Sequence, residues 1–113
     1  MPNIKDVTEL APPQNVSISP ENEQITIIWD TSIHEDKPEF AGYNLYYSRK
    51  SLMFAPIKNL PPPVVLGKNQ HSYTLDNLDP TVKHFVHVRS RDLDGNLSFP
   101  SLPEVIIPPA SSF

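Results

Sequence analysis

The side chains best suited to chemistry in this chain are its histidines, and their spacing argues against a shared metal site. His84 and His87 stand three residues apart in a stretch where apolar and polar residues alternate. On a β-strand, residues three apart point to opposite faces, so these two imidazoles cannot bind one ion. His34 lies beside Glu35 and Asp36, where a hard metal is an alternative but a solvated charged loop is the simpler interpretation. We therefore expect no metal ligands among these residues.

A second segment that resembles a binding motif is the acidic sequence Asp92-Leu93-Asp94-Gly95-Asn96. It is similar to part of a calcium-binding loop, but it lacks the bidentate glutamate that an EF-hand requires. A tight hairpin turn explains the same residues, because Gly and Asn tolerate positive φ. We expect the turn.

The sequence contains none of the motifs that would build a catalytic or phosphate-binding site. There is no Gly-x-Ser-x-Gly elbow, no His-Glu-x-x-His and no glycine-rich loop, and the chain has only 3 glycines. The absence of cysteine removes thiolate zinc sites and cysteine nucleophiles together. We expect no catalytic residue, no cofactor and no metal, so the chain is not expected to be an enzyme.

Composition limits both the architecture and the partners. The 113 residues are enough for one domain, and 14 prolines argue against a helical bundle because proline ends helices. A net charge of −4 disfavours wholesale binding to nucleic acid or anionic membrane. No stretch approaches 18 apolar residues, and residues 1–10 lack the apolar run of a signal peptide. We expect no nucleic acid partner and no membrane insertion, and any targeting segment would lie outside these residues.

The elements that must position these side chains are strands. Apolar and polar residues alternate in short runs bounded by turn residues, and no window shows helical periodicity. Seven strands at spacings of about 8–12 residues predict an all-β, antiparallel β-sandwich. We expect a linker or tail at 1–12, the domain at 13–108 and a C-terminal tail at 109–113. The expected strands lie around 16–19, 24–30, 43–48, 73–75, 84–91 and 105–107, with 54–57 as the candidate for an edge strand.

The stretch from Arg49 to Lys68 fits this pattern least well. Pro61-Pro62-Pro63 removes three backbone donors and favours polyproline II, so Leu60–Val65 is not expected to pair normally. We interpret this segment as a guard at a sheet edge. The alternative is a ligand for an SH3 or WW groove, although only Lys58 supplies a nearby basic residue.

In their order and spacing, several segments resemble a fibronectin type III domain over residues 13–108. The resemblance is carried by Pro13, Ile25-Thr26-Ile27-Ile28-Trp29, Gly42–Ser48, Tyr73–Pro80, Val86–Ser90 and the hairpin Asp92–Ser101, which is similar to that of bacterial members. It implies two antiparallel sheets, A-B-E against C′-C-F-G, and a binding or spacer role without catalysis. The positions that we expect to be structural are Trp29, Tyr43, Leu45, Tyr73, Leu78, His84, Val86 and Val88.

One departure from the family pattern is His84, which stands where the family has a tyrosine at the corner between strands E and F. The hydroxyl of that tyrosine hydrogen-bonds to the backbone. Because an imidazole can donate one comparable bond, we interpret His84 as a structural substitute.

The predicted partner-binding surface is the outer face of strands C and F. By the alternation, the outward side chains are Tyr46, Phe85, His87, Arg89 and Arg91, with Lys83 beside them. Protein interfaces concentrate Tyr, Phe and Arg, so these residues are a candidate recognition patch. An ordinary solvated sheet face explains the same residues and stays open as the alternative.

The sequence thus predicts a non-catalytic interaction or spacer module of a larger extracytoplasmic protein, secreted or held at the cell surface. We expect a monomer that binds a protein, or alternatively a carbohydrate, on the outer face of the C-F-G sheet. The alternative function is an accessory module of a secreted carbohydrate-active enzyme.

Overall fold

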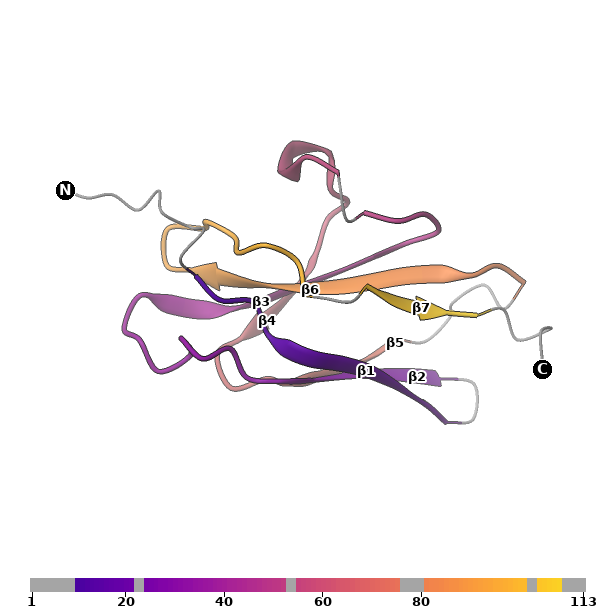
Figure 1. Ribbon diagram of the computed structural model, residues 1–113, viewed down its shortest axis with the longest axis horizontal. Helices are drawn as coiled ribbons and strands as arrows, with labels where there is room; N and C mark the ends of the chain where they lie inside the picture. Colours follow the sequence, from indigo (N-terminus) through magenta and orange to yellow (C-terminus); the bar gives the residue numbers. More distant parts are fainter. Residues whose placement is uncertain (1–9, 22–23, 53–54, 76–80, 102–103, 109–113) are drawn as a thin grey trace.

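Two antiparallel sheets pack face to face in the computed structural model, which describes residues 10–21, 24–52, 55–75, 81–101 and 104–108 (Figure 1). Within these residues there are seven strands and one short 3-10 helix, η2 (Ile57–Asn59). The strands are β1 (Gln14–Glu21), β2 (Gln24–Asp30), β3 (Phe40–Ser48), β4 (Val64–Gly67), β5 (Ser72–Leu75), β6 (His84–Asp92) and β7 (Val105–Ile107).

The strand order confirms the predicted sandwich. One sheet has the order β1-β2-β5 and the other β4-β3-β6-β7, which is the arrangement that the resemblance implied. The longest ladder joins β3 to β6, where Leu45 lies opposite Val88 and Tyr46 opposite His87. In Figure 1, β1 and β2 form the layer below β6 and β7.

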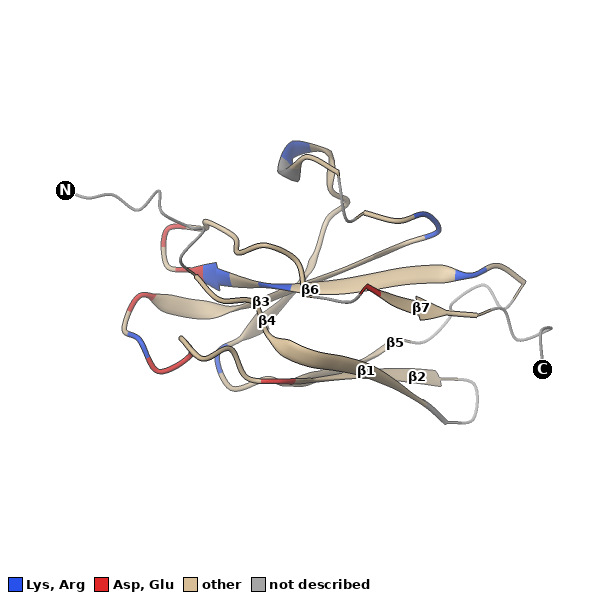
Figure 2. Ribbon diagram, in the orientation of Figure 1, with Lys and Arg blue, Asp and Glu red and all other residues tan. Residues whose placement is uncertain are grey.

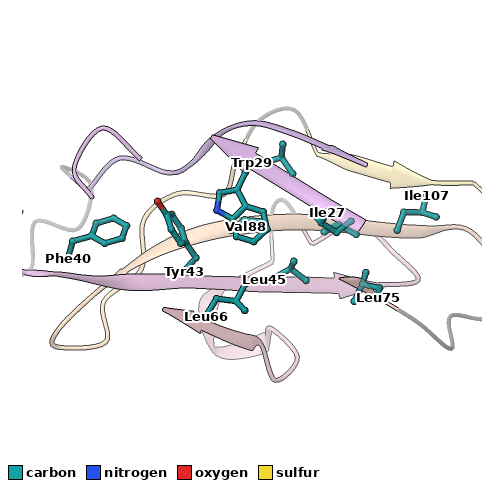
Figure 3. Packing of buried hydrophobic residues seen from close by; sticks show 11 residues of the cluster. Ile27, Trp29, Phe40, Tyr43, Leu45, Leu66, Leu75, Val88 and Ile107 are labelled. Carbon is teal, nitrogen blue, oxygen red and sulfur yellow. The ribbon is translucent and has the colours of Figure 1, made fainter. Parts of the chain in front are cut away.

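The core lies between the two sheets. Alternate side chains of the strands point into it, as the alternation in the sequence predicts. Trp29 is 2% exposed, and its ring meets the ring of Tyr43 edge to face at 5.7 Å. Figure 3 shows these two rings beside Phe40, which also packs edge to face on Tyr43. The buried members of the core are Val16, Ile27, Trp29, Phe40, Tyr43, Leu45, Leu66, Leu75, Val86, Val88 and Ile107.

The expected structural positions are placed as follows. Trp29, Tyr43, Leu45, Val86 and Val88 are buried in this core, and His84 is buried at the first position of β6, opposite Ile107. Leu78 lies outside the described residues. Tyr73 lies opposite Ile27 of β2, on the same face of the sheet, but it is 37% exposed and does not belong to the buried core. It belongs to β5, which pairs only with β2 among the described strands, so no strand shields its far side.

The proline segment lies directly before an edge strand, and the position of that strand differs from the one expected. Residues 61–63 are outside any strand, but Val64 and Val65 pair with Leu45 and Asn44 at the start of β4. The prediction that Leu60–Val65 cannot pair is therefore wrong at its C-terminal end. Residues 55 and 56 are not in a strand either, so the edge strand lies at 64–67 rather than at 54–57. Prolines directly before an edge strand limit its extension by further pairing.

The charged loop between β2 and β3 is attached to the core rather than simply solvated. The Tyr43 hydroxyl donates to Glu35 Oε1 at 2.5 Å, and His71 Nε2 lies 2.8 Å from the same oxygen. The Ala11 amide donates to His34 Nδ1 at 2.9 Å. Burial and the Glu35 contact raise the pKa of the Tyr43 phenol, so it remains a neutral donor. The loop thereby fixes one end of the sandwich.

The predicted hairpin turn after β6 is present. The Asp92 side chain accepts from the backbone amides of Asp94 at 3.0 Å and Asn96 at 2.8 Å, and Gly95 has a φ of 85°. Asp92 therefore stabilises the turn by these hydrogen bonds, as is typical of aspartate in turns.

Candidate functional site

The outer face of the four-stranded sheet carries all five residues predicted to bind a partner. Phe85, His87, Arg89 and Arg91 alternate along β6 with the core residues, and Tyr46 lies opposite His87 on β3. The predicted orientation away from the core is therefore correct.

The expected exposure of these side chains is wrong for three of the five. Tyr46 is 3% exposed, His87 0% and Arg89 5%, whereas Phe85 and Arg91 are half-buried. These three residues lie below other parts of the chain and are not presented to a partner. The face is thus a second interior, with polar and aromatic side chains in place of aliphatic ones.

The cover consists of the segment between β3 and β4 together with the loop after β6. Leu52 and Leu97 are buried against Tyr46, and Ala55 and Leu60 pack on the same cluster. We call residues 49–60, of which 49–52 and 55–60 are described, the strap. In Figure 1 the strap lies above β3 and β6, on the side away from β1 and β2.

Glu104, directly before β7, holds the strap by two hydrogen bonds. The Ser51 hydroxyl donates to Glu104 Oε1 at 2.7 Å, and the Leu52 amide donates to Oε2 at 3.2 Å. A carboxylate that accepts both a side-chain and a backbone donor fixes the segment that carries Leu52. The apolar contact of Leu52 and the Glu104 clamp therefore act on the same short stretch.

A buried pair of His87 and Arg89 lies beneath this cover. Arg89 Nε donates to His87 Nε2 at 3.1 Å, and Arg89 Nη1 donates to the Ser98 carbonyl at 3.1 Å. The ring of Tyr46 lies 5.3 Å from the His87 ring, at an angle of 37°. Because Nε2 accepts, the neutral imidazole carries its proton on Nδ1, which is buried and has no partner among the described residues.

This environment keeps the imidazole neutral. Burial, and secondly the charge of Arg89, lowers the pKa of His87 to about 4. Burial also lowers the pKa of Arg89, which is the cost of holding a guanidinium away from water. A neutral His87 is therefore the state in which Arg89 has a good acceptor.

Arg91 ties the edge strand to this network. Its Nη1 donates to Asn44 Oδ1 at 2.6 Å and to the Tyr43 carbonyl at 3.0 Å, and its Nη2 donates to the Leu66 carbonyl of β4 at 3.3 Å. Asn44 in turn donates from Nδ2 to the Tyr46 hydroxyl at 3.1 Å. The guanidinium thus joins three strands and has a structural role.

One part of the face that the cover leaves open lies at the start of β6. Phe85 is half-buried and pairs with Ile106 of β7, which is 48% exposed. Lys83 Nζ lies 5.5 Å from the centre of the Phe85 ring, within the range of a cation–π contact. We call Lys83, Phe85 and Ile106 the open patch.

The residues that sequence reasoning missed are those of the cover. Leu52, Leu97 and Glu104 lie outside the regular alternating runs, so periodicity assigned them no face. The one available signal was the presence of leucines in a long, proline-containing connection, where a solvated loop would need none.

Comparison with known proteins identifies the family. The family model described as the fibronectin type III domain matches residues 11–106. The chain belongs to the fibronectin type III family. No curated protein matches the chain.

Solved structures agree with this fold at low sequence identity. The chicken CNTN1 FN1–FN3 structure is 18% identical with a TM-score of 0.64, over 85% of this chain and 29% of that one. An Fn3-like protein from Clostridium thermocellum is 18% identical with a TM-score of 0.62, over 86% of this chain and 90% of that one. The spore cortex lytic enzyme SleM from Clostridium perfringens is 13% identical with a TM-score of 0.61, over 88% of this chain and 28% of that one.

Fibronectin type III modules are typically non-catalytic interaction or spacer domains within larger proteins, and they also occur within enzymes such as SleM. This chain spans less than a third of the CNTN1 and SleM structures that it matches. The part of the chain that the structure describes contains no helix long and apolar enough to cross a membrane. Nor do three or more metal-binding side chains gather anywhere in those residues.

Proposed function

We propose that this fibronectin type III domain is a non-catalytic interaction module of a larger extracytoplasmic protein, and that it binds an acidic protein partner through the open patch. The observation that carries the proposal is the half-buried Phe85 beside the exposed Ile106, on a sheet face where Tyr46 and His87 are covered. An apolar centre beside a lysine has the composition that recurs at protein interfaces.

Charge supports an acidic partner. Figure 2 shows Lys and Arg residues where β6 begins and where β3 ends, whereas basic and acidic residues lie together at the opposite end of the same strands. Lys83 directly precedes β6, and Arg49 and Lys50 directly follow β3, where Ser48 pairs with Phe85. The open patch is therefore next to a local basic group on a chain of net charge −4. Attraction between complementary charges accelerates association, and added salt weakens that attraction.

The test is affinity capture from the source cells with the wild-type domain and two double variants. Lys83→Glu with Phe85→Ala removes the patch, and we expect it to lose the partner that the wild type captures at low salt. The matched control, Lys37→Glu with Ile28→Ala, changes one lysine and one exposed apolar residue away from the patch and should capture normally. Equal capture by the patch variant and the wild type would exclude this surface.

The remaining parts of the assignment are also proposals. We propose that the domain is monomeric. We also propose that it belongs to the bacterial branch of the family, on the basis of the hairpin Asp92–Ser101. Placement outside the cytoplasm rests on the family resemblance. Fractionation of the source cells, with detection of the full-length protein at the surface or in the medium, tests the placement, and sedimentation of the purified domain tests the monomer.

An accessory role in a secreted carbohydrate-active enzyme is the second candidate. It is supported by similar structures that include a pectate lyase from Erwinia chrysanthemi in complex with tetragalacturonic acid, which is 12% identical with a TM-score of 0.58 over 81% of this chain and 27% of that one. This candidate predicts a catalytic domain in the same polypeptide, which the complete gene sequence would reveal. It also predicts binding of a polysaccharide by the isolated domain, independent of Lys83.

A further inference from the structure

His87 occupies an environment that protonation would disrupt. It is fully buried, its Nε2 accepts from Arg89, and its ring packs on Tyr46. A protonated imidazole has no acceptor atom, so the Arg89 bond would be lost. Two cations would then face each other across about 3 Å without water to screen them.

The other charged groups around this site do not compensate such a charge. On the strands, Arg91 is bound to Asn44 and to backbone carbonyls. Before β7, both carboxylate oxygens of Glu104 accept hydrogen bonds from the strap. The ionisable groups of the described strap are all basic and exposed: Arg49, Lys50 and Lys58. No carboxylate among the described residues hydrogen-bonds to His87.

The strap lies over the sheet without belonging to it. None of its described residues pairs in a strand, and its one helical element is the three-residue η2. Leu52 and the Glu104 clamp hold it, whereas the main core between the sheets includes neither. The strap can therefore open while the sandwich remains folded, because such openings involve few buried apolar contacts.

We propose that the strap is an acid-sensitive latch, in which protonation of His87 releases its described residues, 49–52 and 55–60, from the sheet and exposes Tyr46 and Leu97. Release would let water reach both cations and would extend the apolar surface of the face. The latch goes beyond the proposed function and does not depend on it, because it is a property of the isolated chain.

Amide hydrogen exchange measured by NMR between pH 7 and pH 5 tests the latch. The reporters are the amides of Leu52, Ala55 and Asn59 in the strap, which are bound to Glu104, Leu52 and Pro56, respectively. After correction for intrinsic rates, we expect their protection factors to fall by up to about tenfold per pH unit below about 6.5. Core amides such as those of Ile27 and Val88 should keep higher protection factors at each pH.

Two control variants distinguish an effect of His87 protonation from a general destabilisation of the strap. His87→Gln keeps an acceptor for Arg89 without a proton to gain, so its strap protection should not change between pH 7 and pH 5. Glu104→Gln should lower the protection factors of the strap amides at both pH values, and these protection factors should still fall between pH 7 and pH 5.

Three results would overturn the latch. The first is strap protection in the wild type that does not change with pH. The second is strap and core amides with equal protection factors at every pH, because the strap would then open only with the whole domain. The third uses no variant: a His87 ring that titrates near 6.5 in the NMR spectrum would show that the imidazole is not held neutral.

Discussion

The guanidinium of Arg91 lies directly over Gly42, and the missing side chain at Gly42 is what makes room for it. A Cβ at Gly42 would stand 2.9 Å from Arg91 Nη2 and 2.2 Å from the Leu66 carbonyl oxygen. Gly42 also has a φ of 155°, next to a register shift in the ladder between β3 and β6. The edge strand β4 approaches β3 closely because this position carries no side chain.

Gly42→Ala should destabilise the domain by roughly 2 kcal/mol or more, because backbone atoms of β4 must move to admit the methyl group. The matched control is Gly95→Ala, where φ is 85° but no atom lies within 4 Å of the added Cβ. That variant should cost only about 1 kcal/mol from backbone conformation. Urea denaturation measures both, and equal losses would contradict the close approach.

His87 predicts a specific dependence of stability on pH. Its folded pKa of about 4 is below its ordinary value of 6.5. Above pH 6.5 the His87 imidazole is neutral in both the folded and the unfolded chain. Between pH 6.5 and pH 4 only the unfolded chain binds the proton, so the free energy of unfolding falls as the pH falls. The slope is about 1.4 kcal/mol per pH unit, and the total is about 3 kcal/mol.

Urea denaturation of the wild type and His87→Gln at several pH values between 7 and 4 measures this contribution. The two unfolding free energies should diverge in slope below about pH 6.5, since the carboxylates that titrate in the same range are common to both proteins. Parallel curves would show that His87 contributes nothing to the pH dependence.

Trp29→Ala should cost about 3–5 kcal/mol, the range for a large core aromatic. Trp29 is 2% exposed, and its indole Nε1 is buried without a partner among the described residues. Trp29→Phe should cost less, because it keeps a ring and removes that unsatisfied donor. Thermal melts follow both variants, and a shift of only a degree or two for Trp29→Ala would place Trp29 outside the core.

Tyr46 should behave as a core residue although it is on the outer face. Tyr46→Ala should cost about 3 kcal/mol, and Tyr46→Phe about 1 kcal/mol because the Asn44 amide loses its acceptor. Phe85→Ala, at the open patch on the same face, should cost clearly less than Tyr46→Ala. The midpoints of urea denaturation rank the three, and a Tyr46→Ala variant within 0.5 kcal/mol of the wild type, the range for surface substitutions, would mean that the cover is absent in solution.

His84→Tyr should be tolerated or stabilising, and His84→Ala should cost about 1–3 kcal/mol, if His84 replaces the corner tyrosine of the family. His84 is 6% exposed at the first position of β6, so the position can hold a buried donor. A Tyr variant that unfolds more readily than the Ala variant would reject the corner role.

Much of the fold follows from the sequence because strand faces are encoded locally. Trp29 stands two residues after Ile27, and Val88 two residues after Val86, and side chains two apart on a strand share a face. The alternation therefore predicted which residues point inward, and the family resemblance predicted the order of the strands in each sheet. The edge strand at 64–67 was missed because it follows three prolines, and only the ladder with β3 shows that Val64 and Val65 pair.

The candidate site depended on contacts that no local pattern contains. Period-two alternation determined that Tyr46, His87 and Arg89 point away from the core, which the structure confirms. Alternation gives the direction of a side chain but not what lies above it. Ser51 and Glu104 are 53 residues apart, and their hydrogen bond brings the strap over the sheet. Burial of the outer face was therefore decided by tertiary structure alone, because it arises from segments distant in sequence that meet only when both sheets have formed.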